Sequence, residues 1–96
     1  LYDDILNNPD SQARYEAIAR SVEMANTRTL EVLTQAVNDA EANNRLAALE
    51  GLEQLLQQGI ATTEQLTSTL QQTTTDPDER VATLATRLLQ EHNEPI

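Results

Sequence analysis

The chain has 96 residues, of which 16 are acidic and 6 are basic, so its net charge at neutral pH is −10. It contains no cysteine, which excludes a disulfide framework, a thiolate nucleophile and a cysteine zinc site. So acidic a chain is repelled by phosphate groups, which argues against nucleic acids and anionic membranes as partners. No apolar run approaches the roughly 18 residues that a membrane span needs. The sequence starts at Leu1 and not at methionine, so we expect a soluble chain that is processed or a fragment, and its compartment stays open.

The first two predicted helices flank a turn at residues 8–11. Residues 1–7 are typical of the end of a short helix whose apolar positions are Tyr2, Ile5 and Leu6. The stretch Asn8-Pro9-Asp10-Ser11 is a helix start signal, because Asp and Ser side chains can accept bonds from free backbone N–H groups. The helix that follows is expected to end near Asn26 and to bury a stripe formed by Tyr15, Ile18, Ala19 and Val22.

Two further helices are predicted in the middle of the chain. Thr27 or Thr29 can cap the first, whose apolar residues are Leu30, Leu33 and Val37. A third start signal, Asp39-Ala40-Glu41, precedes a helix with the apolar residues Leu46, Leu49, Leu52, Leu55 and Leu56. Gly59 suits the position just past the end of that helix.

The last part of the chain predicts two more helices. Thr62 or Thr63 can cap the first of them, which carries Leu66 and Leu70. The clearest start signal follows, because Asp76 suits an N-cap and Pro77 suits the first helical position. The apolar stripe of the last helix is Val81, Leu84, Ala85, Leu88 and Leu89. We expect this helix to fray near His92 and the tail of residues 93–96 to be loose.

The starts at Asn8, Asp39 and Asp76 define an internal repeat, because the segments that follow them align without gaps. The aligned sets are Asp10, Glu41 and Asp78; Ala17, Ala48 and Ala85; Ile18, Leu49 and Thr86; Ser21, Leu52 and Leu89. The acid can cap a helix, and the alanine allows a paired helix to approach closely. One helical hairpin cannot bury its apolar face alone, whereas several hairpins stacked in register can.

The segment Asp76-Pro77-Asp78-Glu79-Arg80-Val81, followed by Ala85, resembles the opening of the second helix of a HEAT or HEAT-like (armadillo-type) repeat. In that family an Asp of the hairpin turn and an Arg of the second helix form a ladder between repeats. Arg14 and Arg45 stand at the position of the family's Arg, whereas the third copy has Ala82 there. The first copy has Asn8 in place of the Asp, and the second has Asn44 in place of a Val. The resemblance therefore implies a partial ladder.

The expected fold is all-α: a short right-handed α-solenoid of stacked helical hairpins over residues 1–96. The hairpin units span about residues 1–26, 27–59 and 60–92, with a tail at 93–96. The alternative is a closed bundle of five to six helices. The two differ in one feature, because a closed bundle packs its first and last helices together and a solenoid does not.

Chemistry-bearing residues are few. His92 lies beside Glu91 and near Glu94, but adjacent positions on a helix do not face each other, so we expect a solvated helix end and no metal site. Carboxylate pairs such as Glu50 and Glu53 suit solvated helix faces and lack the apolar cleft that acid–base catalysis needs. The sequence thus predicts a protein that is not an enzyme and has no cofactor.

In a HEAT-like stack the second helix of each hairpin lines the concave side. Polar side chains at those positions predict a groove for a protein or peptide partner; the candidate binding residues are Arg14, Arg20, Glu23, Arg45, Gln54, Gln57, Arg80 and Arg87. The acidic balance favours a basic or mixed-charge partner. The opposing interpretation is a solvated face that keeps an acidic domain soluble.

The predicted function is that of a non-catalytic scaffold for protein–protein interaction. Two alternatives remain open: an accessory or subunit domain of a larger enzyme complex, and a secreted or regulatory helical-bundle protein.

Overall fold

The computed structural model describes residues 1–93, and all regular structure in that part of the chain is α-helical. The helices are α1 (Tyr2–Asn7), α2 (Ser11–Met24), α3 (Thr27–Ala36), α4 (Ala42–Gln57), α5 (Thr63–Thr73) and α6 (Glu79–Asn93). The expectation of an all-α fold is confirmed. None of these helices combines the length and the apolar character needed to cross a lipid bilayer.

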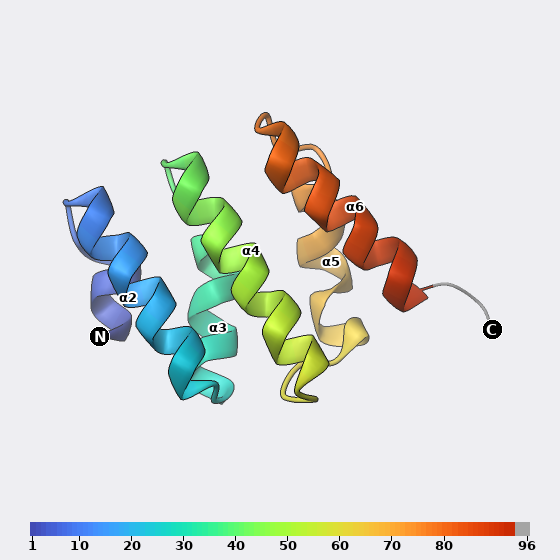
Figure 1. The fold of residues 1–96 in the computed structure, drawn as a ribbon, viewed down its shortest axis with the longest axis horizontal. Coiled ribbons are helices and arrows are strands. Elements are labelled where there is room, and N and C mark those ends of the chain that lie inside the picture. Colours follow the sequence, from blue (N-terminus) through green and yellow to red (C-terminus); the bar gives the residue numbers. More distant parts are fainter. Residues whose placement is uncertain (94–96) are drawn as a thin grey trace.

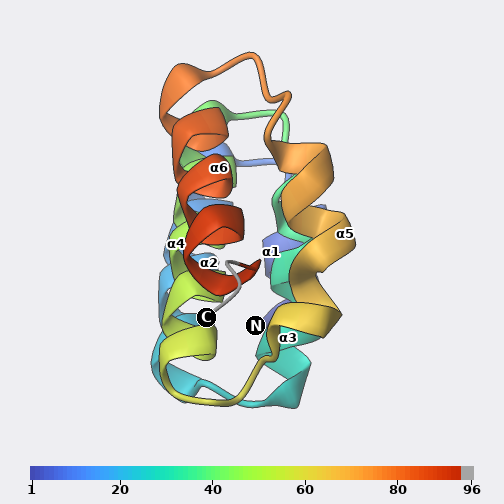
Figure 2. The same ribbon diagram turned by 90° about the vertical axis from the view of Figure 1, so that its right-hand side faces the viewer.

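Consecutive helices pair as α1 with α2, α3 with α4, and α5 with α6. The longer helices α2, α4 and α6 lie side by side in one layer, and α1, α3 and α5 lie behind them in a second layer (Figures 1 and 2). The longest dimension is 43 Å, and the first and last helix pairs lie at its opposite ends. Among the described residues, the helices of these two end pairs share no extensive contact.

The three turns that precede α2, α4 and α6 have the same local structure. The side chains of Asn8, Asp39 and Asp76 each accept a hydrogen bond from the backbone N–H two residues further on, at 2.9, 2.9 and 2.8 Å. Each helix then begins three residues after that side chain. These bonds close the turn and fix the direction in which the helix leaves it.

The predicted start of the last helix is wrong by two residues. Asp76 does not cap α6 and Pro77 is not its first residue, because α6 begins at Glu79 and the N–H of Arg80 bonds to the side chain of Asp78. The same arrangement holds in α2, where Asp10 is the N-cap and accepts from Gln12 N–H. The side chains of Asn8 and Asp76 accept the bonds that close the turns. The backbone N–H groups at the start of each helix therefore bond to the next acidic residue, Asp10 or Asp78.

The other helix ends follow ordinary capping rules. Asn26 caps α3 through a reciprocal capping box with Thr29, so the expected cap at Thr27 or Thr29 is wrong, although Thr29 completes the box. Thr62 caps α5 as predicted, again through a capping box, with Gln65. Gly59 lies just past α4 with φ +77°, which a residue without a side chain adopts at no steric cost.

The core confirms most of the predicted apolar positions. Ala17, Ala48 and Ala85 are all buried, as the repeat alignment requires. The core otherwise consists mainly of aliphatic residues; those with no exposed surface include Ile5, Ile18, Leu33, Leu49, Leu52, Leu55, Leu66, Leu70, Val81 and Leu88. Thr86 is exposed, although its counterparts Ile18 and Leu49 are fully buried, so the third copy departs from the first two at this position.

The predicted stripe of α2 is wrong in part. Tyr15 is 42% exposed and Ala19 is exposed, while the buried residues of this helix are Ala17, Ile18 and Ser21. The core-facing stripe of α2 is therefore rotated away from Tyr15, which is left on the outer face of the helix layer.

Gly51 of α4 packs against side chains of both α2 and α3. A Cβ atom added there would lie 2.6 Å from Cγ2 of Val22 and 2.8 Å from Cδ1 of Leu33. Both distances are shorter than a carbon–carbon contact allows, so a larger residue at this position would force the methyl groups of Val22 and Leu33 to move.

Candidate functional site

Two arginine–aspartate pairs connect neighbouring helix pairs. Arg14 of α2 donates to Asp39 through Nε at 2.9 Å and Nη2 at 3.1 Å, and its Nη1 donates to the carbonyl oxygen of Asn8 at 2.8 Å. Arg45 of α4 repeats this pattern with Asp76, at 2.8 and 3.2 Å, and with the carbonyl oxygen of Asp39, at 2.9 Å. In both cases the arginine lies six residues after the carbonyl that it binds.

The charges in these pairs stabilise each other. The Asp39 hydrogen bond raises the pKa of Arg14, and the Asp76 hydrogen bond raises that of Arg45. Burial opposes ionisation of Asp39, but the bonds from Arg14 and from Glu41 N–H outweigh it, so the pKa of Asp39 is lowered. The side chains of Arg14 and Arg45 are only 14% and 15% exposed. Of the predicted binding residues, these two are therefore occupied within the protein.

The other predicted binding residues are exposed on the α2–α4–α6 layer: Arg20, Glu23, Gln54, Gln57, Arg80 and Arg87. The structure does not gather them at one point. Arg87 bonds to Glu53 of α4 at 3.1 Å and to Glu91 of its own helix at 3.1 Å.

Arg80 is held by two neighbours near the start of α6. It donates to the Asp78 carboxylate and, at 2.9 Å, to the side-chain oxygen of Asn43 on α4. The hydrogen bond from Arg80 lowers the pKa of Asp78 to about 2. Arg80 thus links α6 to α4 and remains exposed to solvent.

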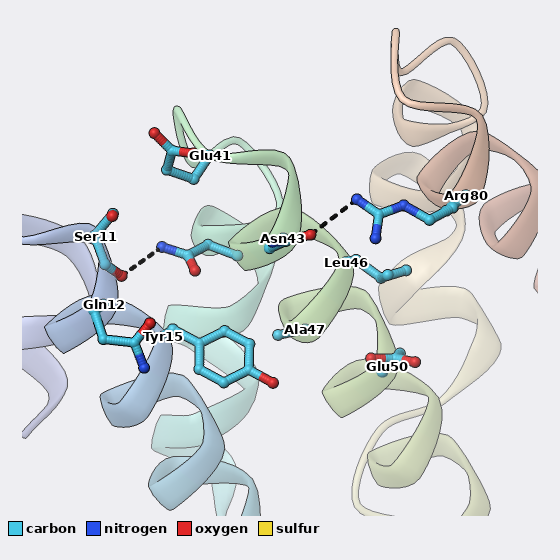
Figure 3. A pocket seen from close by; sticks show the side chains of 10 residues that line it. Ser11, Gln12, Tyr15, Glu41, Asn43, Leu46, Ala47, Glu50 and Arg80 are labelled. Carbon is cyan, nitrogen blue, oxygen red and sulfur yellow. Dashed lines mark hydrogen bonds between the residues drawn. The ribbon is translucent and has the colours of Figure 1, made fainter.

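A depression of about 350 Å³ opens on the outer face of the helix layer (Figure 3). It lies between α2 and α4, with Arg80 at the far side; its lining residues are Ser11, Gln12, Tyr15, Glu41, Asn43, Asn44, Leu46, Ala47, Glu50 and Arg80. The ring of Tyr15 extends from α2 toward Ala47 of α4. Asn44 of α4 donates a hydrogen bond to the carbonyl oxygen of Ser11 at 3.0 Å, which holds α4 against the start of α2.

Two further depressions share lining residues with this one. One follows the groove between α2 and α4 and is about 300 Å³, and the other follows the groove between α4 and α6 and is about 460 Å³. Glu50 of α4 lines all three, so it is the residue on which the grooves converge.

Sequence reasoning missed both Tyr15 and Glu50 as surface-site residues. A signal for Tyr15 was present, because it lies two residues before Ala17, and two residues on a helix differ by about 200° in direction. Tyr15 and Ala17 therefore cannot both face the core, and the repeat alignment had already placed Ala17 there. Nothing in the sequence distinguishes Glu50 from the other exposed glutamates.

Among the side chains that the structure describes, no group of three or more could hold a metal ion. The trio of Glu91, His92 and Glu94 lies partly outside the described residues. Comparison of the chain with family models, with curated proteins and with solved structures finds no match.

Proposed function

We propose that this chain is a short right-handed α-solenoid of the HEAT-like kind and acts as a non-catalytic scaffold for protein–protein interaction. In this proposal the α2–α4–α6 layer is the binding face. The partner is a protein or peptide with basic or mixed charge, attracted by the acidic surface.

The observation that carries the proposed architecture is the pair of matching links Arg14–Asp39 and Arg45–Asp76. Each joins a second helix to the turn of the next hairpin, and each adds the same bond to a backbone carbonyl. This geometry corresponds to the ladder that the resemblance implies, with Asn8 and Ala82 at its two unpaired ends. The separation of the first and last helix pairs further favours an open array over a closed bundle.

The proposed binding role is supported by the shape and charge of the α2–α4–α6 layer. The grooves along α4 are open, and exposed glutamates line them: Glu23, Glu41, Glu50 and Glu79. The Arg80 and Arg87 side chains nearby are already bonded to acidic neighbours. A partner that brings cations would therefore find carboxylate acceptors in the grooves.

The experiment selects randomised displayed peptides on the protein and maps the enriched ones by amide chemical-shift changes in NMR spectra. We expect enriched peptides with net positive charge, and shift changes at α2, α4 and α6. Replacing the central carboxylate, in Glu50→Arg, should weaken binding by reversing the local charge. A matched control is Glu31→Arg, because Glu31 is an exposed glutamate on α3 in the other layer.

Three results would contradict this proposal. They are shift changes confined to α1, α3 and α5, equal binding by the two charge-reversed variants, and a selection that enriches no peptide.

A further inference from the structure

The groove between α2 and α4 combines an exposed aromatic ring with carboxylates on both sides. Its two depressions share Tyr15, Ala47 and Glu50, so they form one continuous groove. Its lining includes the small or apolar residues Val22, Ala47 and Gly51. We call this surface, lined by Tyr15, Val22, Glu23, Ala47, Glu50 and Gly51, the Tyr15 groove.

The two carboxylates of the Tyr15 groove are free of direct ion pairs among the described side chains, although the charge of Glu50 also acts on Arg80. Within residues 1–93, neither Glu23 nor Glu50 takes part in an ion pair. Arg80, which lines the same depression, is bonded to Asp78 and Asn43. An exposed tyrosine ring near carboxylates is electrostatically complementary to a cation, because the carboxylates are anionic and the ring face is the negative side of its quadrupole.

The chain's other tyrosine, Tyr2, already makes a contact with an arginine side chain. The guanidinium carbon of Arg28 lies 5.3 Å from the centroid of the Tyr2 ring, which is a cation–π contact. Tyr2 is half-buried and has its arginine, whereas Tyr15 is 42% exposed and has no such contact within the described residues. Guanidinium groups stack on aromatic faces and bind carboxylates in a planar geometry, which an ammonium group does not do.

We propose that the Tyr15 groove is the site where the partner docks an arginine side chain, with its guanidinium stacked on Tyr15 and paired with Glu50. This inference rests on the proposed function and makes it specific, because it names the partner residue and the point on the binding face. The partner's neighbouring apolar atoms lie along the floor of the groove, and a second cation reaches Glu23 on the α2 rim.

The test uses a capped hexapeptide of alternating alanine and arginine as the probe, titrated against the full chain by NMR. The expected result is saturable shifts at the amides of Tyr15, Ala47 and Glu50. The same peptide with citrulline in place of arginine keeps the shape but lacks the charge, and it should give no such shifts. A lysine version should bind more weakly, because its ammonium does not stack.

Two variants separate the contributions of ring and charge. Tyr15→Ala and Glu50→Gln should each weaken the arginine peptide about two- to fivefold, as expected for exposed cation–π and ion-pair contacts. Tyr15→Phe keeps the ring and should retain binding, and Glu31→Gln on α3 is the matched charge control. Unchanged melting temperatures show that the variants are folded, since both side chains of the site are exposed.

The proposal is overturned if the lysine and arginine peptides bind equally, or if Glu31→Gln weakens binding as much as Glu50→Gln. It also fails if the shifts lie in the groove between α4 and α6, at Thr83 and Arg87. That last result would leave the broader proposal intact, because the displayed peptides would still map to the α2–α4–α6 layer.

Discussion

The two junctions between neighbouring hairpins are built on the same ion pair but differ in the packing around it. At the first junction, α2 packs on both α3 and α4, and α1 packs on α3, so both layers are joined. At the second junction, only α4 and α6 pack extensively, and α5 packs mainly on α6. The third hairpin is thus attached through one layer alone.

This difference indicates which junction depends more on its polar links. The first can lose an ion pair and keep packing in two layers. The second relies on α4–α6 packing, on Arg45–Asp76 and on the more exposed contacts of Arg80 and Arg87. We therefore expect hydrogen exchange to be faster in the third hairpin than in the second.

The largest expected effect comes from overfilling the central hairpin. Ala48 has no exposed surface, so Ala48→Leu should lower the free energy of unfolding by about 1–3 kcal/mol, measured by urea denaturation. Ala19→Leu is the matched control, because Ala19 is exposed on α2 and should tolerate the change. An unchanged Ala48→Leu variant would show that the alignment of Ala17, Ala48 and Ala85 does not reflect packing.

The comparison of junctions is tested by removing one arginine at a time. Arg45→Ala leaves the mostly buried carboxylate of Asp76 without its partner, and we expect a loss of about 1–2 kcal/mol. Hydrogen exchange should accelerate selectively in α5 and α6. Arg14→Ala should have a smaller and more evenly spread effect, because the first junction keeps its packing in both layers. Equal and uniform effects of the two changes would refute the proposed asymmetry.

Acid should weaken the first junction. Because the folded pKa of Asp39 is lowered, the protein gains stability from its ionised form above the unfolded value of about 3.9. That stability is lost as the pH falls through the lowered folded value. Urea denaturation of Asp39→Asn should therefore depend less on pH below about 4 than that of the unchanged chain. An identical pH dependence in both proteins would contradict this assignment.

The smallest effect is expected at the exposed contact across the second junction. Arg87 is 49% exposed and pairs with Glu53, so Arg87→Ala should change stability only slightly and only at low salt. The measurement is the melting temperature at low and high salt, with Arg20→Ala as an exposed control. A large effect that persists in high salt would mean that this contact carries more of the junction than Arg45.

The all-α class and most of the core could be predicted from sequence, because apolar spacing and alanine positions agree for α4 and α6. The start of α6 was misplaced, since the function of Asp76 depends on Arg45, which lies far away in sequence. The expected burial of Tyr15 was wrong because Tyr15, Ile18 and Val22 form an apolar stripe in the sequence. The face of α2 that is buried instead contains Ala17, Ile18 and Ser21. The convergence of the grooves on Glu50 depends on how three helices are placed side by side, which no single segment encodes.

Because the turns at Asn8, Asp39 and Asp76 have the same structure, a further hairpin with such a turn could be added to the chain. Each of these turns offers a side-chain acceptor, and in the first two hairpins the arginine six residues after the turn residue donates to the next turn, at Asp39 and Asp76. Consider an additional hairpin that carries an Asp in its turn and an Arg six residues later. Inserted between the second and third hairpins, its Asp could accept from Arg45 and its Arg could donate to Asp76. The added unit would keep both arginine–aspartate links, whereas the contacts of Arg80 with Asn43 and of Arg87 with Glu53 would need equivalents on its second helix.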